Sequence, residues 1–187
     1  MRILEYLVQS LLWILLLGLQ AALADSPNLG KPVTAADIAR WDIDIGRDGK
    51  GLPPGEGTPT QGGIIFAEKC SACHGDGGRG TALSRSGAPA PPALVSDKKI
   101  KGIDASTTTI ANYWPYAPPL FDYIRRAMPW NQPRSLTDHE VYALTAYILS
   151  ENKLIAPKQV IDARTLSKVI MPNRNGFLMR FPELTPH

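Results

Sequence analysis

The residues with the most distinctive chemistry in this sequence are its two cysteines and the histidine that follows the second of them. Cys70 and Cys73 stand three positions apart and His74 comes directly after, which is the C-x-x-C-H pattern of c-type haem attachment. Thiols at this spacing lie on one side of a helical turn. Each can then add to one vinyl group of a haem, and the next imidazole can bind the iron. The pattern predicts one covalently bound haem c with His74 as an iron ligand.

A redox-active C-x-x-C pair of the thioredoxin kind is the main alternative use of these cysteines. That kind of site belongs to a βαβ unit, and the residues before Cys70 show no strand alternation. Because no third cysteine is present, a structural disulfide beside the haem is excluded as well. Haem attachment is the interpretation that accounts for both thiols and the histidine together.

A second iron ligand is expected among the methionines and the remaining histidines. Electron-transfer haems take methionine or histidine in this position, and a methionine thioether raises the reduction potential. Met128 follows a predicted helix and precedes Pro129, so a stiff turn would hold its sulfur in place. Met171 also precedes a proline but lies in the C-terminal segment, and His139 stands in the first turn of a predicted helix, where a solvated side chain is expected. Met128 is therefore the expected sixth ligand, with Met171 second and core packing as the alternative for either.

Four further residues are candidates for the haem pocket. Pro92 lies in a Pro-Pro-Ala-Leu segment soon after the motif, and this segment could supply the carbonyl that accepts the other ring N–H of His74. A structural loop is the alternative. Three aromatic residues flank the Met128 region and could donate to haem propionates or pack in the pocket wall: Trp114, Tyr116 and Trp130.

Helices are the elements that would position these residues. The spacing of apolar residues predicts four of them, over residues 34–41, 60–72, 119–126 and 137–150. The last is the clearest, because Thr137 and Glu140 form the pattern of a capping box. Residues 75–116 show little periodicity, and a loop that long in a small domain needs something large to pack against. A haem meets that need.

The first residues have the composition of a secretion signal. Arg2 gives a positive start, residues 11–17 form an apolar core, and Ala22-Leu23-Ala24 supplies small residues where a signal peptidase recognises them. We expect cleavage after Ala24, hence a signal peptide at 1–24 and export to the periplasm. The alternative is an uncleaved membrane anchor, although the apolar stretch from 7 to 23 is at the short edge of a membrane span.

The remaining chain is expected to be a central domain between two arms. Residues 62–150 hold the motif and the longer predicted helices. Residues 25–61 are rich in glycine, proline and aspartate, and residues 151–187 carry isolated apolar pairs, so both are expected to be extended. The fold class is therefore mainly α. A formal net charge of +3, without a basic run interleaved with aromatic residues, argues against a nucleic-acid partner.

The central domain resembles the class I cytochrome c family. The resemblance rests on the attachment motif together with Gly62, Phe66, Met128-Pro129 and Ala146-Tyr147-Ile148. It covers about residues 62–150 and implies the class I cytochrome c fold, in which the first and last helices cross. Gly62 and Phe66 would then pack against Tyr147.

A narrower resemblance extends over nearly all of the chain after residue 24. It is to the SoxD-type cytochrome subunit of sulfane dehydrogenases, and the similar segments are Trp41–Asp44, Gly51–Gly55, Tyr113–Ala117, Leu120–Pro129 and Val169–Arg174. This resemblance implies haem roles for the two cysteines, His74 and Met128. It also implies a molybdenum-cofactor partner similar to sulfite oxidase, on which both arms would lie. Full-length members of that family have a second haem domain, whereas this sequence has one C-x-x-C-H motif, so the sulfur substrate stays open.

Three classes of function are compatible with these features. The leading hypothesis is an electron-transfer subunit that is not itself an enzyme. It would accept electrons from a molybdenum-cofactor sulfane or sulfite dehydrogenase and pass them to a soluble cytochrome or a terminal oxidase. The second is a free-standing electron shuttle without a fixed partner. The third is a haem enzyme, which would need an open or labile sixth position at the iron.

Overall fold

The computed structural model describes residues 2–22, 29–81, 91–97 and 108–178, and the chain forms two compact units, 1–42 and 43–187, which are described separately. The first unit contains α1 (Arg2–Ala22) and α2 (Ala35–Trp41). α2 begins as predicted, with a capping box between Thr34 and Asp37. Among the described residues no helix is both long and apolar enough to cross a membrane. The predicted cleavage site lies outside them.

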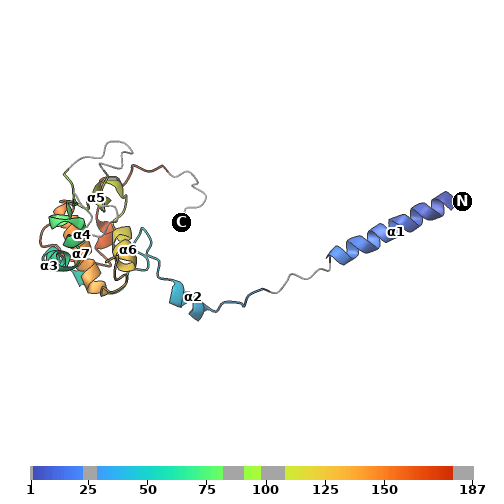
Figure 1. Cartoon of the computed structure of the whole chain (residues 1–187), viewed down its shortest axis with the longest axis horizontal. Helices are drawn as coiled ribbons and strands as arrows, with labels where there is room; N and C mark the ends of the chain where they lie inside the picture. The colour runs from blue at the N-terminus through green and yellow to red at the C-terminus, as the bar shows by residue number, and fades with distance from the viewer. Residues whose placement is uncertain (1, 23–28, 82–90, 98–107, 179–187) are drawn as a thin grey trace. The chain divides into compact units, whose positions relative to one another are not determined.

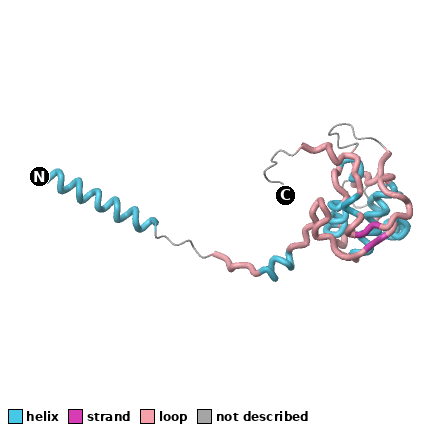
Figure 2. Tube along the Cα trace, turned by 180° about the vertical axis from the view of Figure 1, so that it is seen from behind, coloured by secondary structure: helices cyan, strands magenta, loops and turns pink. Residues whose placement is uncertain are grey.

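The second unit is mainly α, as expected (Figure 1). Its helices are α3 (Pro59–Lys69), α4 (Ser71–His74), α5 (Ile110–Tyr113), α6 (Pro118–Ala127) and α7 (Asp138–Glu151), with the 3-10 turns η1 (Asp76–Gly78) and η2 (Leu166–Lys168). Two short strands, β1 (Glu56–Gly57) and β2 (Ile161–Asp162), form an antiparallel pair in which Gly57 lies opposite Ile161 (Figure 2). Segments from the two ends of this unit therefore lie side by side.

The helices agree with the predicted ones except at the attachment motif. α6 and α7 keep to within about one residue of their predicted bounds, and α7 has the predicted capping box at Thr137. The helix expected over 60–72 is interrupted at Cys70, whose backbone (φ −125°, ψ −34°) separates α3 from α4. α5 has no predicted counterpart, since it is a single turn started by a capping box between Thr109 and Asn112.

The crossing of α3 and α7 is the main helix contact of the fold, as the class I resemblance implies. Gly62 lies so close to α7 that a Cβ atom there would overlap the Ala143 carbonyl oxygen. One turn further along α3, the Phe66 and Tyr147 rings meet with centroids 5.1 Å apart. The predicted packing of Gly62 and Phe66 against Tyr147 is confirmed.

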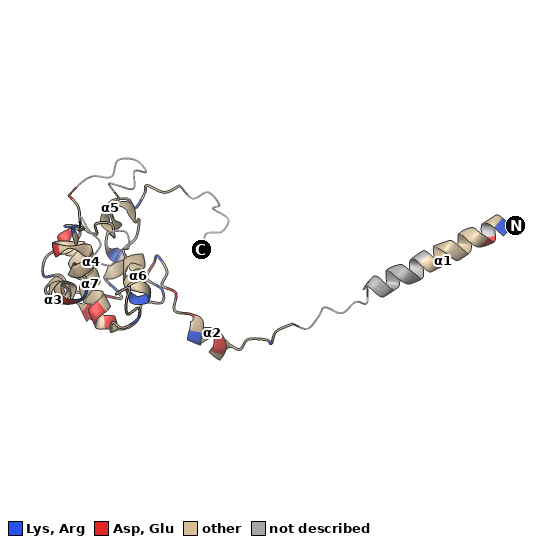
Figure 3. Cartoon of the chain, viewed as in Figure 1, with Lys and Arg blue, Asp and Glu red and all other residues tan. Residues whose placement is uncertain are grey.

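Ion pairs add to the contacts that α7 makes with its neighbours. Lys69 at the end of α3 lies 2.6 Å from the Glu140 carboxylate, and this bond is the largest cause of the lowered pKa of Glu140. Arg125 in the basic last turn of α6 donates to Asp138 in the acidic first turn of α7 at 2.9 Å (Figure 3). These pairs are partly exposed, so they orient the helices more than they stabilise them.

Residues 43–57 pack against the helices, which differs from the extended arm expected over 25–61. Ile45 is buried, and a Cβ atom at Gly57 would overlap the backbone of Ala143. The hydroxyl of Tyr142, on α7, donates to the Pro53 carbonyl at 2.8 Å. Arg126 holds the start of the segment, donating to the Ile43 carbonyl at 3.1 Å and to the Asp44 carboxylate at 2.6 Å.

The C-terminal segment also differs from the extended arm expected over 151–187. Four of its side chains are buried in the core of the second unit: Ile161, Leu166, Val169 and Met171. The turn between the first two is held by the Asp162 carboxylate, which accepts hydrogen bonds from the Thr165 hydroxyl and from the Arg164 backbone. Because turns of this kind separate the buried residues, their sequence has no helical or strand period.

Replacing Tyr142 with phenylalanine should lower the free energy of unfolding by about 1–2 kcal/mol, because a carbonyl loses its partner while the ring is kept. The Tyr142 ring packs on Phe121 with centroids 4.4 Å apart, and phenylalanine preserves that contact. Urea denaturation followed by circular dichroism measures the change. Tyr147→Phe is the control, since Tyr147 packs through its ring on Phe66. Equal midpoints for the two variants would contradict the role given to the Pro53 hydrogen bond.

Candidate functional site

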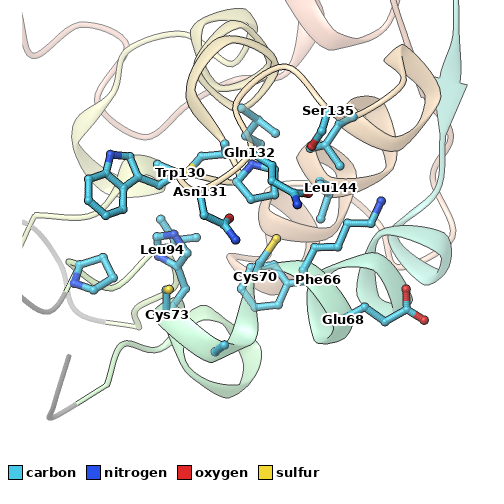
Figure 4. A pocket seen from close by; sticks show the side chains of 18 of the residues that line it. Phe66, Glu68, Cys70, Cys73, Leu94, Trp130, Asn131, Gln132, Ser135 and Leu144 are labelled. Carbon is cyan, nitrogen blue, oxygen red and sulfur yellow. The ribbon is translucent and has the colours of Figure 1, made fainter. Parts of the chain in front are cut away.

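One pocket of the second unit brings together most of the residues that the sequence singles out (Figure 4). The cavity has a volume of about 840 Å³. Its lining includes Cys70, Cys73, His74 and Met128. Figure 4 shows the two cysteines on one side of the cavity, with Trp130, Asn131 and Gln132 facing them from the segment that follows Met128. The predicted attachment motif and the predicted sixth ligand therefore face one cavity.

The short helix α4 presents the attachment motif, and the turn after it fixes the position of His74. Gly75 has φ +74°, and a Cβ atom there would overlap the Gly80 carbonyl, so the chain can turn back at this point only through glycine. Gly80 N–H then donates to the His74 carbonyl at 2.8 Å, and the Thr81 hydroxyl donates to the Cys73 carbonyl at 3.3 Å. This closed loop holds the histidine backbone at the edge of the cavity.

The two cysteines differ in their surroundings. Cys70 is half-buried, and burial is the main cause that raises the pKa of its thiol to about 11. Cys73 is exposed, and both thiols are free. Their sulfur atoms lie on the same side of the attachment segment, facing the cavity, as the vinyl-addition chemistry requires (Figure 4).

His74 has the properties of an iron ligand. Its Nδ1 is buried and, among the described residues, has no hydrogen-bond partner of normal geometry. Burial lowers the pKa of the ring, while a hydrogen bond to the backbone carbonyl of Pro92 acts in the opposite direction, which places this carbonyl beside the imidazole. A neutral imidazole is the form that binds a metal, and a carbonyl beside its second nitrogen is the usual orienting group.

The segment that carries Pro92 is tied to two other elements. The Gly78 carbonyl accepts hydrogen bonds from the Leu94 N–H at 2.8 Å and from the Val95 N–H at 3.0 Å. At the end of α7, the Asn152 side chain donates to the Leu94 carbonyl at 3.1 Å. The carbonyl beside His74 is therefore positioned by the fold itself.

Met128 stands where α6 ends. Its N–H closes the helix by donating to the Ile124 carbonyl at 3.1 Å, while its own backbone is extended (φ −117°, ψ 146°) and leads into a cis peptide with Pro129. Trp130 follows with 76% of its surface exposed at the mouth of the cavity. Met171, the second candidate, is buried in the core and is not among the lining residues.

The walls between these groups suit a flat, apolar macrocycle. Besides Met128 and Trp130, six of the lining side chains are large and apolar: Phe66, Leu94, Ile124, Leu136, Leu144 and Ile148. Paired thiols, an imidazole and a thioether are donors typical of haem c, whereas they are not those of a hard cation. The residues present therefore fit a haem bound through Cys70 and Cys73, with His74 and Met128 as its axial ligands.

Two of the predicted pocket residues lie elsewhere. Trp114 is not among the lining residues, and its ring meets that of Tyr123 with centroids 6.0 Å apart. Tyr116 is not among them either, and its ring contacts two arginines. His139 is exposed, with Nδ1 3.0 Å from the Glu56 carbonyl oxygen. Sequence proximity to Met128 does not place the two aromatic residues at the cavity, because α6 intervenes.

Sequence reasoning missed the polar residues that line the cavity on the Met128 side. Asn131, Gln132 and Ser135 come from the loop between α6 and α7, where the Gln132 N–H donates to the Pro129 carbonyl at 2.9 Å. The available signal was their position directly after the Met-Pro pair. Lys69 also lines the cavity, next to the first attachment cysteine.

Comparisons with known proteins agree with this site. The family pattern described as Cytochrome c matches residues 59–152. A chain in the crystal structure of the sulfane dehydrogenase SoxCD from Paracoccus pantotrophus is similar, with a TM-score of 0.70 and 31% sequence identity over 85% of this chain and 75% of that one. Curated proteins gave no match. The chain thus belongs to the class I cytochrome c family, whose members bind haem c covalently, and it is SoxD-like.

Proposed function

We propose that this chain is the electron-transfer subunit of a periplasmic complex that oxidises a sulfur compound. It accepts electrons from a molybdenum-cofactor sulfane or sulfite dehydrogenase partner, similar to sulfite oxidase. It then passes them to a downstream cytochrome c or an oxidase. The observation that carries the electron-transfer part is the cavity itself, which is lined by both cysteines, His74 and Met128. The likeness to a chain of SoxCD supports the sulfur-oxidising complex.

The residues of the cavity would have different roles in binding a haem. Cys70 and Cys73 would hold the haem covalently, while His74 and Met128 would ligate its iron, which supplies one-electron chemistry. The apolar walls would keep water from the iron of a bound haem, and a thioether ligand in a dry site would favour the reduced state. Trp130 and Cys73 are exposed, so this edge of the cavity is where electrons can enter or leave.

The other two hypotheses gain less from the structure. A haem enzyme needs an open sixth position, and here Met128 is placed at the cavity by the end of α6. A free-standing shuttle remains the alternative to a fixed complex. Removing residues 151–187 does not separate shuttle from subunit, because that segment supplies Met171 and other core side chains whose loss would unfold the domain.

Co-purification distinguishes a dedicated subunit from a free-standing shuttle. We expect the full-length haem protein, released from the periplasm by osmotic shock, to elute in gel filtration together with a molybdenum-containing protein in a fixed ratio of haem to molybdenum. The reason is that a dedicated subunit binds its partner more tightly than a shuttle, whose contact is small and transient. Haem absorbance and metal analysis across the peak measure the ratio. A haem protein that elutes alone, free of molybdenum, would support the shuttle, and retention in the cytoplasm would contradict the location.

A further inference from the structure

Two arginines converge on one aromatic ring at the surface of the second unit. The guanidinium carbons of Arg47 and Arg174 lie 5.6 and 5.0 Å from the centroid of the Tyr116 ring. Both distances are within the range of a cation–π contact. We call these three residues the arginine–tyrosine cluster. Both arginines are exposed, and the tyrosine is half-buried.

Three segments bring the cluster together, and hydrogen bonds hold the two that carry the arginines. Arg174 stands at the end of a turn that begins at buried Met171, whose carbonyl accepts from the Arg174 N–H at 3.1 Å. The neighbouring Asn173 side chain donates to the Tyr113 carbonyl at 2.7 Å. Arg47 stands on a tight loop closed by the bond from the Gly46 N–H to the Lys50 carbonyl at 2.8 Å. The fold therefore brings the two charges together before any partner is bound.

No carboxylate among the described residues forms an ion pair with the cluster. Arg125, Arg126 and Arg164 each bind a carboxylate in the same unit. Within the described part of the chain, no ion pair is formed by Arg47 or Arg174. Two guanidinium groups on one ring repel each other, and both side chains are exposed. A guanidinium carries N–H donors in a planar fork that can bind a carboxylate at two points.

Exposed apolar residues come from the same segments as the cluster. The side chains of Ile170 and Leu178 are 77% and 97% exposed. Phe177 is 49% exposed, and its ring meets that of Tyr113 edge-on with centroids 5.4 Å apart. Arginine, tyrosine and other aromatic side chains beside exposed aliphatic ones are the composition of a protein interface rather than of a solvated surface.

We propose that this surface docks an acidic face of the molybdenum-cofactor subunit, with a carboxylate of that subunit bound by the arginine–tyrosine cluster. The proposal rests on the proposed function, because it names the partner. A protein carboxylate fits better than a free anion. An ion on an exposed arginine is screened by water and salt, whereas a partner surface covers the pair and strengthens it.

The cluster acts as an anchor, apart from the path of the electron. Tyr116 lies just before the first turn of α6 and Met128 just after its last, so a helix of 10 residues, about 15 Å long, separates them. Tyr116 is also not among the residues that line the haem cavity. Changes in the cluster should therefore alter binding of the partner and leave the reduction potential unchanged.

The test compares two double variants of the full-length holoprotein. Arg47→Gln with Arg174→Gln removes two charges from the cluster. Lys153→Gln with Lys158→Gln removes two from exposed lysines elsewhere on the unit. The Kd of each for the co-purifying molybdenum subunit is measured by surface plasmon resonance at low and high salt. We expect the arginine variant to raise the Kd at least about tenfold and to weaken its salt dependence, with the lysine variant within about twofold of wild type.

The results of the binding experiment test the docking surface and the proposed function separately. If wild-type protein binds the molybdenum subunit and the arginine variant binds equally well, this inference is overturned while the proposed function stands. If no molybdenum protein binds even the wild type, both fall. An Arg47→Lys, Arg174→Lys variant that regains only part of the affinity shows that two-point binding matters beyond charge. An unchanged reduction potential in every variant confirms that the haem domain is intact.

Discussion

Replacing Gly62 with alanine is expected to lower the free energy of unfolding by at least about 3 kcal/mol, the upper range for overpacked cores. The added methyl group would overlap the Ala143 carbonyl oxygen and lie 2.7 Å from the Cβ atom of Tyr147. Both neighbours belong to α7, so neither can move without separating the two helices. Alanine favours a helix over glycine by about 1 kcal/mol, which the overlap outweighs. Urea denaturation of the holoprotein measures the loss.

Gly63→Ala is the matched control, one position further along α3. There the added methyl group meets the edge of the Tyr147 ring at 3.3 Å, and that side chain can shift by the few tenths of an ångström required. Helix propensity then decides the sign, and we expect a stability unchanged or raised by up to about 1 kcal/mol. Two variants with the same chemistry should thus differ in their free energy of unfolding by at least about 3 kcal/mol. Similar denaturation midpoints for both would contradict the close crossing of α3 and α7.

Replacing Met128 with leucine should lower the reduction potential and open the iron to small ligands. Leucine has a similar volume but no donor atom, so the pocket wall survives while the proposed sixth ligand is lost. A thioether ligand raises the potential, and axial ligands set it over a span of about 0.8 V in haem proteins. Redox titration and binding of carbon monoxide to the reduced protein measure the two effects.

Met171→Leu provides the comparison. Met171 is 1% exposed and belongs to the core, so the same substitution should cost less than about 1.5 kcal/mol and leave both potential and carbon monoxide binding as in the wild type. If the Met171 variant, and not the Met128 variant, bound carbon monoxide, the assignment of the sixth ligand would have to be reversed.

The parts of the fold that could be predicted are those with local signals. Thr137 starts α7 through a capping box that is legible in four residues, and the C-x-x-C-H motif requires no context at all. The core residues after α7 could not be predicted in this way. Ile161 and Leu166 are buried by turns and by pairing with residues about a hundred positions earlier, and such contacts leave no period in the sequence.

The residues of the candidate site also differ in whether a local signal in the sequence predicts their position. Met128 and the carbonyl of Pro92 could be placed because each stands at a fixed position beside a helix end or soon after the motif. Trp114 and Tyr116 were expected at the pocket because they precede Met128 in sequence, yet neither is among the residues that line the cavity. The direction in which an aromatic side chain points from a loop depends on tertiary packing, as the contact of Trp114 with Tyr123 illustrates.

The pairing of β1 with β2 decides where this haem domain can be cut if it is to be fused to another protein. A segment cut at the bounds of the family pattern, 59–152, would omit both strands. It would also uncover Tyr142, which is fully buried, and discard the buried Ile161 and Met171. The smallest segment that keeps the β1–β2 pair and the buried core therefore runs from about residue 43 to 171. A fusion protein should be joined to the chain outside those limits.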